Sequence, residues 1–217
     1  MSIQHTSSLL GAACMAVALA AAPAWAAGSA APQAYGPLHA NPAGSYQVDP
    51  DHSGVQFTIG HAGVGRFTGV FKQVTGSYTF NPGNPKQDKA DITIPAKSLD
   101  TFMPQRDTDL LAAPFFDATA HPDIHFVSTR YVPQGKDHGT LYGNLTLRGV
   151  TKPAVFHVRL IGAGGVAYLP KPWGGYLSGF VATTTINRMD FGMTAFATGL
   201  SHEVKVRVEI EGVKAAS

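Results

Sequence analysis

The stretch YGNLTLRGVTKPAVFHVRL, residues 142–160, alternates apolar and polar side chains on both sides of a short polar turn. A period of two is typical of a β-strand with one buried face, so the stretch predicts a β-hairpin. Gly149 can take the positive φ of a tight turn, while Pro153 lacks an N–H and suits the start or edge of a strand. The apolar positions of the two arms are Leu141, Leu145, Leu147, Phe156, Val158 and Leu160.

The same alternation recurs along the rest of the chain, most clearly in residues 203–211, where Val and Ile alternate with Glu, Lys and Arg. Similar runs lie at residues 55–61, 74–80, 92–96, 124–128 and 179–187. A short helix is expected at 106–112, because Asp107 and Asp109 suit a first turn and Pro114 would end it. We therefore predict an all-β single domain of about eight antiparallel strands, which periodicity alone leaves open as a sandwich or a barrel.

The N-terminal region predicts export. Residues 1–48 contain no Asp, Glu, Lys or Arg, residues 9–22 are apolar, and Ala24-Trp25-Ala26 suits a signal peptidase. We expect a signal peptide at 1–26, a flexible leader at 27–45, the domain at 46–213 and a tail at 214–217. A lipoprotein attached through Cys14 is the alternative, although Gly11 stands where a bulky aliphatic residue is usual.

Composition excludes several classes of protein. The chain has 16 Lys and Arg against 14 Asp and Glu and contains no basic run, which argues against a nucleic-acid partner. Its single cysteine, Cys14, would leave with the signal peptide, so the exported chain would have neither a disulfide nor a thiolate metal site.

No pattern in the sequence indicates catalysis or a metal. His121 and His125 have a helical ligand spacing, but in an extended chain they would lie about 13 Å apart, so no metal site is predicted. His52, His61, His157 and His202 could converge in space, and we interpret them as structural. The string GYLSG at 175–179 displaces the serine that a nucleophile elbow requires, and Asp190 suits a turn beside Arg188.

Several motifs, taken in order, resemble the YceI-like polyisoprenoid-binding proteins of the bacterial periplasm. The resemblance covers roughly Tyr46 to Val213. It includes YQVDPDHS at 46–53, SLDT at 98–101, RD at 106–107, FF at 115–116, GNLTLRGVTKP at 143–153 and INRMDFG at 186–192. Two positions depart from the family pattern, since Lys171 stands where an Asp often precedes Pro-Trp-Gly and Leu177 stands where an Arg often follows. These departures affect any inference about headgroup contacts if the loop rims the pocket.

The resemblance implies an extended lipocalin-like barrel with an apolar channel for an isoprenoid quinone or polyprenyl lipid, and no covalent cofactor. The candidate ligand-binding residues are apolar side chains that would form its wall or its core: Phe57, Ile59, Phe71, Leu110, Leu111, Phe115, Phe116, Phe126, Leu145, Leu147, Phe156, Val158, Phe180 and Phe191. One of the adjacent Phe115 and Phe116 would cap the channel, unless both simply pack in the core.

The favoured hypothesis is a periplasmic carrier of an amphiphilic lipid without catalysis. It leaves open a transient contact with a membrane or membrane protein, and a homodimer. The alternatives are an enzyme acting on a prenyl lipid and a β-sandwich interaction module.

Overall fold

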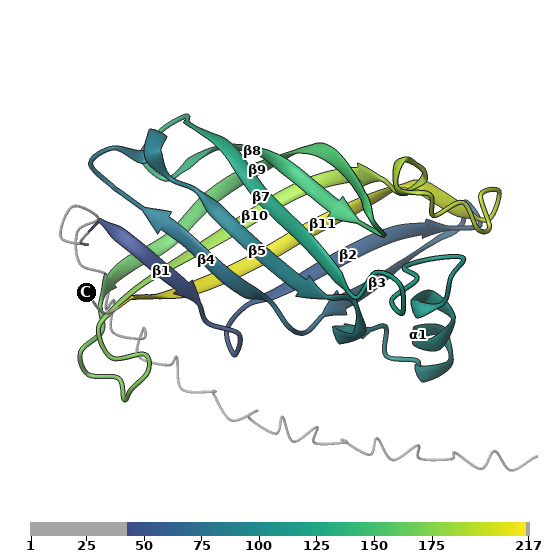
Figure 1. The fold of residues 1–217 in the computed structure, drawn as a ribbon, viewed down its shortest axis with the longest axis horizontal. Coiled ribbons are helices and arrows are strands. Elements are labelled where there is room, and N and C mark those ends of the chain that lie inside the picture. Colours follow the sequence, from purple (N-terminus) through teal and green to yellow (C-terminus); the bar gives the residue numbers. More distant parts are fainter. Residues whose placement is uncertain (1–42, 216–217) are drawn as a thin grey trace, which may run out of the picture. The chain divides into compact units, whose positions relative to one another are not determined.

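The sheet closes on itself through its first strand. In the computed structural model, which describes residues 43–215, β1 (Gly44–Val48) pairs with β4 (Thr75–Phe80) on one side and with the end of β11 (Leu200–Lys214) on the other. The closed ring runs β1–β4–β5–β7–β8–β9–β10–β11 and back to β1, with every pairing antiparallel (Figure 1). The predicted barrel of about eight strands is confirmed, and the β-sandwich alternative is wrong.

Three further strands extend the sheet at one end of the ring. The first part of β11 pairs with β2, which pairs with β3, and β3 pairs with the short β6. The remaining strands are β2 (Gly54–His61), β3 (Gly65–Phe71), β5 (Ala90–Pro95), β6 (Leu99–Asp100), β7 (Asp123–Pro133), β8 (His138–Leu147), β9 (Val150–Gly165) and β10 (Tyr176–Asn187). Short 3-10 turns lie at Pro85–Gln87, Ala96–Ser98 and Arg188–Phe191.

The predicted hairpin is formed by β8 and β9, and its turn consists of Arg148 and Gly149. Both residues have positive φ, at 51° and 71°, as the common two-residue hairpin turn requires. Pro153 pairs with Asn144 of β8, and it lies beyond the part of β9 that pairs with β10. Its missing N–H therefore removes no ladder hydrogen bond on that side, in line with its expected edge position.

The helix begins earlier than the sequence pattern suggested. α1 spans Pro104–Leu111, with Pro104 at its first position, where the missing N–H would have had no intrahelical partner. Asp107 accepts hydrogen bonds from the backbone N–H and the hydroxyl of Thr101, so it holds the chain that enters the helix. Among the described residues, no helix is both long enough and apolar enough to span a bilayer.

One polar contact lies inside the barrel wall. The Tyr78 hydroxyl lies 2.9 Å from the Ser178 carbonyl oxygen and 2.7 Å from its hydroxyl, and Ser178 itself is buried. Burial raises the pKa of Tyr78 well above its usual range. The ring of Tyr78 packs directly over Gly212 of β11, so closely that a Cβ at Gly212 would overlap it.

This contact leads to a stability prediction. Gly212→Ala should lower the free energy of unfolding by about 1–3 kcal/mol, because the methyl group would displace the Tyr78 ring in a packed wall. Gly179→Ala is the matched control on the neighbouring strand. Apart from its chain neighbours, the nearest atom would lie 3.9 Å from the new Cβ, which is an ordinary van der Waals contact. Urea unfolding followed by circular dichroism measures both variants. Equal losses in the two variants would contradict the prediction.

Candidate ligand cavity

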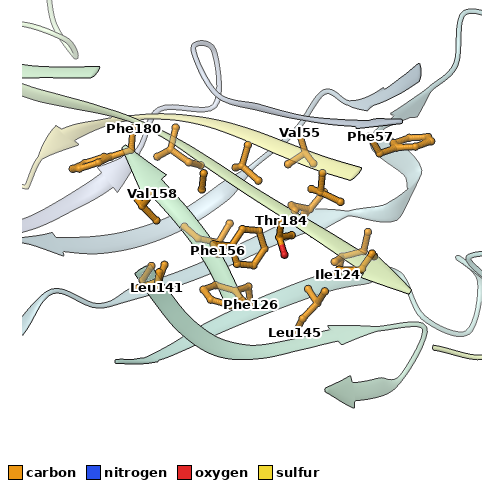
Figure 2. Close-up of a pocket in the computed structure, with 18 of the residues that line it drawn as sticks. Val55, Phe57, Ile124, Phe126, Leu141, Leu145, Phe156, Val158, Phe180 and Thr184 are labelled. Carbon is orange, nitrogen blue, oxygen red and sulfur yellow. The ribbon is translucent and has the colours of Figure 1, made fainter. Parts of the chain in front are cut away.

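A cavity of about 1250 Å³ lies inside the barrel. Inward-facing side chains of the strands and of α1 line it, and most of them are aliphatic or aromatic. Figure 2 shows Phe126, Phe156, Val158 and Phe180 directed into this space, and Thr184 contributes the one oxygen among the labelled side chains. The edge-to-face pair of Phe126 and Phe156, with ring centroids 5.0 Å apart, joins neighbouring parts of the wall.

All the candidate ligand-binding residues except Leu111 and Phe191 line the cavity. Leu111 packs partly buried against the core, and Phe191 is buried in the 3-10 turn after β10. Phe115 and Phe116 both line the cavity, and Phe116 also meets the Phe71 ring edge-on. That these residues contact a lipid stays a prediction.

Several further residues of the cavity wall were not among the ligand-binding candidates predicted from the sequence. The inward positions of β11 contribute Val204, Val206, Val208 and Ile210, and other strands contribute Ile92, Ile94, Ile124, Leu141, Ala182 and Ile186. The alternation in residues 203–211 was the sequence signal that could have identified the inward residues of β11. It marks one buried face, although it does not show whether that face meets a cavity or a filled core.

The ionisable residues that line the cavity differ between its two ends. His61, Arg66, Arg106 and Arg188 lie at the end that carries α1 and the β2–β3 hairpin. Asp88, Lys89, Lys136 and Asp137 lie at the opposite end, near the β4–β5 and β7–β8 connections. The first set is basic, whereas the second contains equal numbers of acidic and basic residues.

Arg188 is a buried guanidinium, only 2% exposed. It donates hydrogen bonds to the backbone carbonyls of Met193, Ala195, Leu200 and Ser201, rather than to Asp190 beside it in the turn. Burial lowers its pKa from the usual value. Because so many carbonyls satisfy this one side chain, Arg188 fixes the connection between β10 and β11.

Arg106 connects α1 to the β2–β3 hairpin. Its guanidinium carbon lies 3.7 Å from the centre of the Phe67 ring, within the range of a cation–π contact. It also donates to the Thr101 hydroxyl at 3.0 Å and to the Thr101 carbonyl at 2.6 Å. This end of the cavity therefore has a basic side chain held in place on both sides.

At the opposite end, Asp88 is partly buried and accepts a 2.8 Å hydrogen bond from the backbone N–H of Asn81. Burial raises the pKa of Asp88 to about 7, and the hydrogen bond opposes the rise only in part. The protonation state of the Asp88 carboxyl group therefore changes near neutral pH.

A second polar cluster joins the loop 166–175 to the segment between β1 and β2. Asp49 Oδ2 lies 2.6 Å from His52 Nδ1 and accepts from Trp173 Nε1 at 2.5 Å. Glu211 Oε1 lies 4.0 Å from His52 Nδ1, so the three side chains form a group with the geometry of potential metal ligands. Asp49 Oδ2 already has two hydrogen-bonding partners, which fits a structural contact, and none of these residues lines the cavity.

The four histidines that could have converged lie in separate settings. His52 belongs to the Asp49 cluster, His61 lines the cavity, and His202 contacts the Ala197 carbonyl. His157 lies in a shallow depression with Thr183 and Thr185 that is distinct from the cavity. Lys171 and Leu177, the two departures from the family pattern, do not line the cavity either.

Burial would raise the pKa of Asp49, but hydrogen bonds from His52, the Asp51 N–H and Trp173 outweigh it and lower the pKa. The hydrogen bond to Asp49 raises the pKa of His52, an effect that burial partly opposes. Both shifts favour the ionised pair, so the contact is strongest between the two pKa values.

The YceI-like domain family matches residues 46–212 of this chain. A UPF0312 protein of Pectobacterium carotovorum is 38% identical over 174 residues, which cover 79% of this chain and 88% of that protein. A UPF0312 protein of Pseudomonas aeruginosa is 36% identical, with 79% of this chain and 88% of that protein covered.

Solved structures share the fold. BcnA of Burkholderia cenocepacia superposes with a TM-score of 0.68 at 21% identity, covering 76% of this chain and 99% of BcnA. The YCEI protein of Campylobacter jejuni gives a TM-score of 0.59 at 27% identity, covering 68% and 85%. A polyisoprenoid binding domain from Saccharophagus degradans gives 0.57 at 13% identity, covering 78% and 98%.

The Asp49 contact can be tested by removing its indole donor. Trp173→Phe should lower the free energy of unfolding at pH 7 by about 1–2 kcal/mol, since a buried carboxylate loses a donor. Asp49 has a depressed pKa in the folded state, so its contribution is present above the unfolded pKa of about 3.9 and is lost as pH falls through the folded value. The loss caused by the variant should therefore shrink in acid. Urea unfolding at several pH values measures it, with Tyr168→Phe in the same loop as the control.

Asp88 gives the opposite pH dependence. Its folded pKa is raised, so ionisation disfavours the folded state as pH rises from about 3.9 through about 7. Asp88→Asn keeps an oxygen for the Asn81 N–H and removes the charge. The variant should match the wild type in melting temperature at pH 4 and exceed it at pH 8. A gain of the same size at both values would contradict the assigned cause.

Proposed function

Because the chain belongs to the YceI-like family, we propose that it is a periplasmic carrier that holds an isoprenoid lipid, a quinone or a similar amphiphile in its barrel. The observation that carries the proposal is the long apolar cavity inside a closed sheet. Pockets for drug-sized ligands hold roughly 300–1000 Å³, so a cavity of about 1250 Å³ suits a larger, elongated molecule. The polyisoprenoid binding domain of Saccharophagus degradans, named for such a ligand, supports the choice of ligand class.

The lining explains how such a ligand would be held. Burying a methylene group contributes about 0.8 kcal/mol, so about ten buried carbons contribute roughly 8 kcal/mol before ordering costs are subtracted. That corresponds to about micromolar affinity. A prenyl tail therefore needs few polar contacts, in agreement with the mostly apolar wall.

The export part of the proposal rests on the apolar N-terminal run and its small-residue cleavage pattern at Ala24-Trp25-Ala26. The predicted signal peptide and leader, and Cys14, lie outside the described residues except for the last residues before Tyr46. Edman sequencing of the protein recovered from the periplasm should begin at Ala27.

For the enzyme alternative, His52 and His61 are the two candidate active groups to test. His52 does not line the cavity and is hydrogen-bonded to Asp49, whereas His61 lies exposed at one end of the cavity. Turnover of a prenyl phosphate that is lost in His61→Ala would favour the enzyme over the carrier.

Filling the cavity tests the carrier function. Ala182→Phe places an aromatic ring in the middle of the wall, between Val158 and Val208 on the neighbouring strands, and should weaken binding of geranylgeraniol at least about tenfold. Thr185→Phe on the same strand is the control, because Thr185 is exposed and does not line the cavity. Calorimetric titration measures both variants.

A lipid extract of the protein from its native host, analysed by mass spectrometry, should contain a stoichiometric prenyl compound. If no such compound is recovered and the wild type does not bind geranylgeraniol, the carrier function is wrong.

A further inference from the structure

The three most exposed of the large apolar side chains in the described part of the chain lie at the end of the barrel that carries α1. Val64 at the tip of the β2–β3 hairpin is 91% exposed, Phe102 before α1 is 77% exposed, and Phe196 in the β10–β11 connection is 72% exposed. Met103 next to Phe102 is also exposed. We call these four residues the apolar rim. They come from three separate segments of the chain, all at the right-hand end of the barrel in Figure 1.

Two rim residues have an unfavourable backbone conformation. Phe102 has φ of 61° and Phe196 has φ of 51°, in the left-handed region that bulky residues rarely adopt. The Phe102 N–H donates to Asp100 Oδ1 at 2.8 Å, and the Phe196 carbonyl accepts from the N–H groups of Gly199 and Leu200. The structure thus holds each phenylalanine in a conformation that glycine or asparagine would adopt at lower cost.

The segment that carries Phe196 is also firmly anchored. Arg188 donates to the carbonyls of Met193 and Ala195, which precede Phe196 in the chain. Arg148 donates to the carbonyls of Gly192 and Ala113. The Phe196 ring stacks on Phe115 with centroids 6.1 Å apart, and Phe115 lines the cavity. Phe196 is mostly exposed, its backbone is strained, and the segment around it is firmly held. Such a side chain gains little stability from burial, which indicates a role other than folding.

The apolar rim adjoins an end of the cavity that reaches the surface. The lining residues His61, Gly65 and Arg66 are exposed, and they belong to the hairpin whose tip is Val64. A hydrocarbon ligand that enters here would meet apolar side chains before it meets the barrel interior.

We propose that the apolar rim docks this end of the barrel on a lipid bilayer, so that the ligand passes between membrane and cavity without crossing water. The proposal rests on the proposed lipid-carrier function. Single protruding side chains from three segments suit insertion into a fluid bilayer better than contact with a flat, rigid protein face.

The charges beside the rim agree with this partner. Arg66 is exposed and can meet a lipid phosphate, and the nearby Asp100 is paired with Lys72 at 3.1 Å. Asp109 on the exposed side of α1 offsets part of that attraction. Apolar insertion therefore carries most of the association, which should be weak and reversible and should depend little on salt.

The test replaces the two strained phenylalanines by asparagine. Phe102→Asn combined with Phe196→Asn should reduce flotation with vesicles of phosphatidylcholine and phosphatidylethanolamine about tenfold or more, because two aromatic groups no longer insert. Asparagine tolerates the left-handed conformation, which offsets the loss of the Phe196–Phe115 stacking, so the melting temperature should stay close to that of the wild type. Tyr168→Asn, an exposed aromatic at the opposite end of the barrel, should leave flotation unchanged.

Two further measurements separate this proposal from the carrier function. The double variant should bind geranylgeraniol in solution as the wild type does, while its transfer of that lipid between vesicles should slow in parallel with flotation. If wild type and double variant float equally, or if the wild type does not float, bilayer docking is wrong even where geranylgeraniol binding is intact. If ultracentrifugation shows a wild-type dimer that the double variant loses, the rim joins two copies of the chain and bilayer docking is again wrong.

Discussion

The closed sheet depends on the hydrogen bonds that β11 makes with three other strands. It pairs with β10 along most of its length, with β1 through Gly212, Val213 and Lys214, and with β2 through its earlier residues. Without the β1–β11 pairing the ring would open and expose two edges. The inward residues of β11 would then face water instead of a cavity, so a single strand accounts for both the closure and much of the wall.

The two ends of the cavity are stabilised by different means. At the α1 end, Arg188 and Arg148 bind backbone carbonyls of several connections, and among the described residues neither forms an ion pair with a carboxylate. A buried guanidinium costs solvation energy that several carbonyl partners must offset. This arrangement fixes the connections, and the arginines that line the cavity at the α1 end have no acidic residue beside them in that lining. At the other end Asp88 and Asp137 balance Lys89 and Lys136, so charge distinguishes the two ends.

The sequence predicted the fold well because its strands alternate strictly and its turns carry distinctive residues. Gly149 took the expected positive φ and Pro153 took an edge position. Periodicity alone left the sandwich and the barrel open, because both bury one face of each strand. The pairing of β1 with the end of β11 decides for the barrel that the family resemblance implied. The same ambiguity explains why Phe191 was proposed as a candidate although it packs outside the cavity lining.

Other features could not be predicted because they depend on contacts between distant residues. Nothing in the local sequence shows that Trp173 reaches Asp49, or that Arg188 prefers carbonyls to the adjacent Asp190. The exposure of Phe102 and Phe196 was equally hidden, since an apolar residue near a turn is usually buried. Residues that break the local rules of burial or backbone conformation within a well-packed fold are expected at functional positions.

The energetics of a hydrocarbon ligand connect the cavity with the rim. If burial of about ten carbons contributes roughly 8 kcal/mol, release of the same ligand into water must reverse all of that contribution. A carrier with an apolar interior would therefore bind such a ligand well and release it into water slowly. Contact between the mouth and a bilayer removes this barrier, because the ligand then moves from one apolar environment to another. Phe196 stands at that boundary, with one face of its ring on Phe115 of the cavity wall and the rest of the side chain in solvent. In the bilayer-docking proposal, the strained backbone at Phe102 and Phe196 serves the exchange of the ligand rather than its retention.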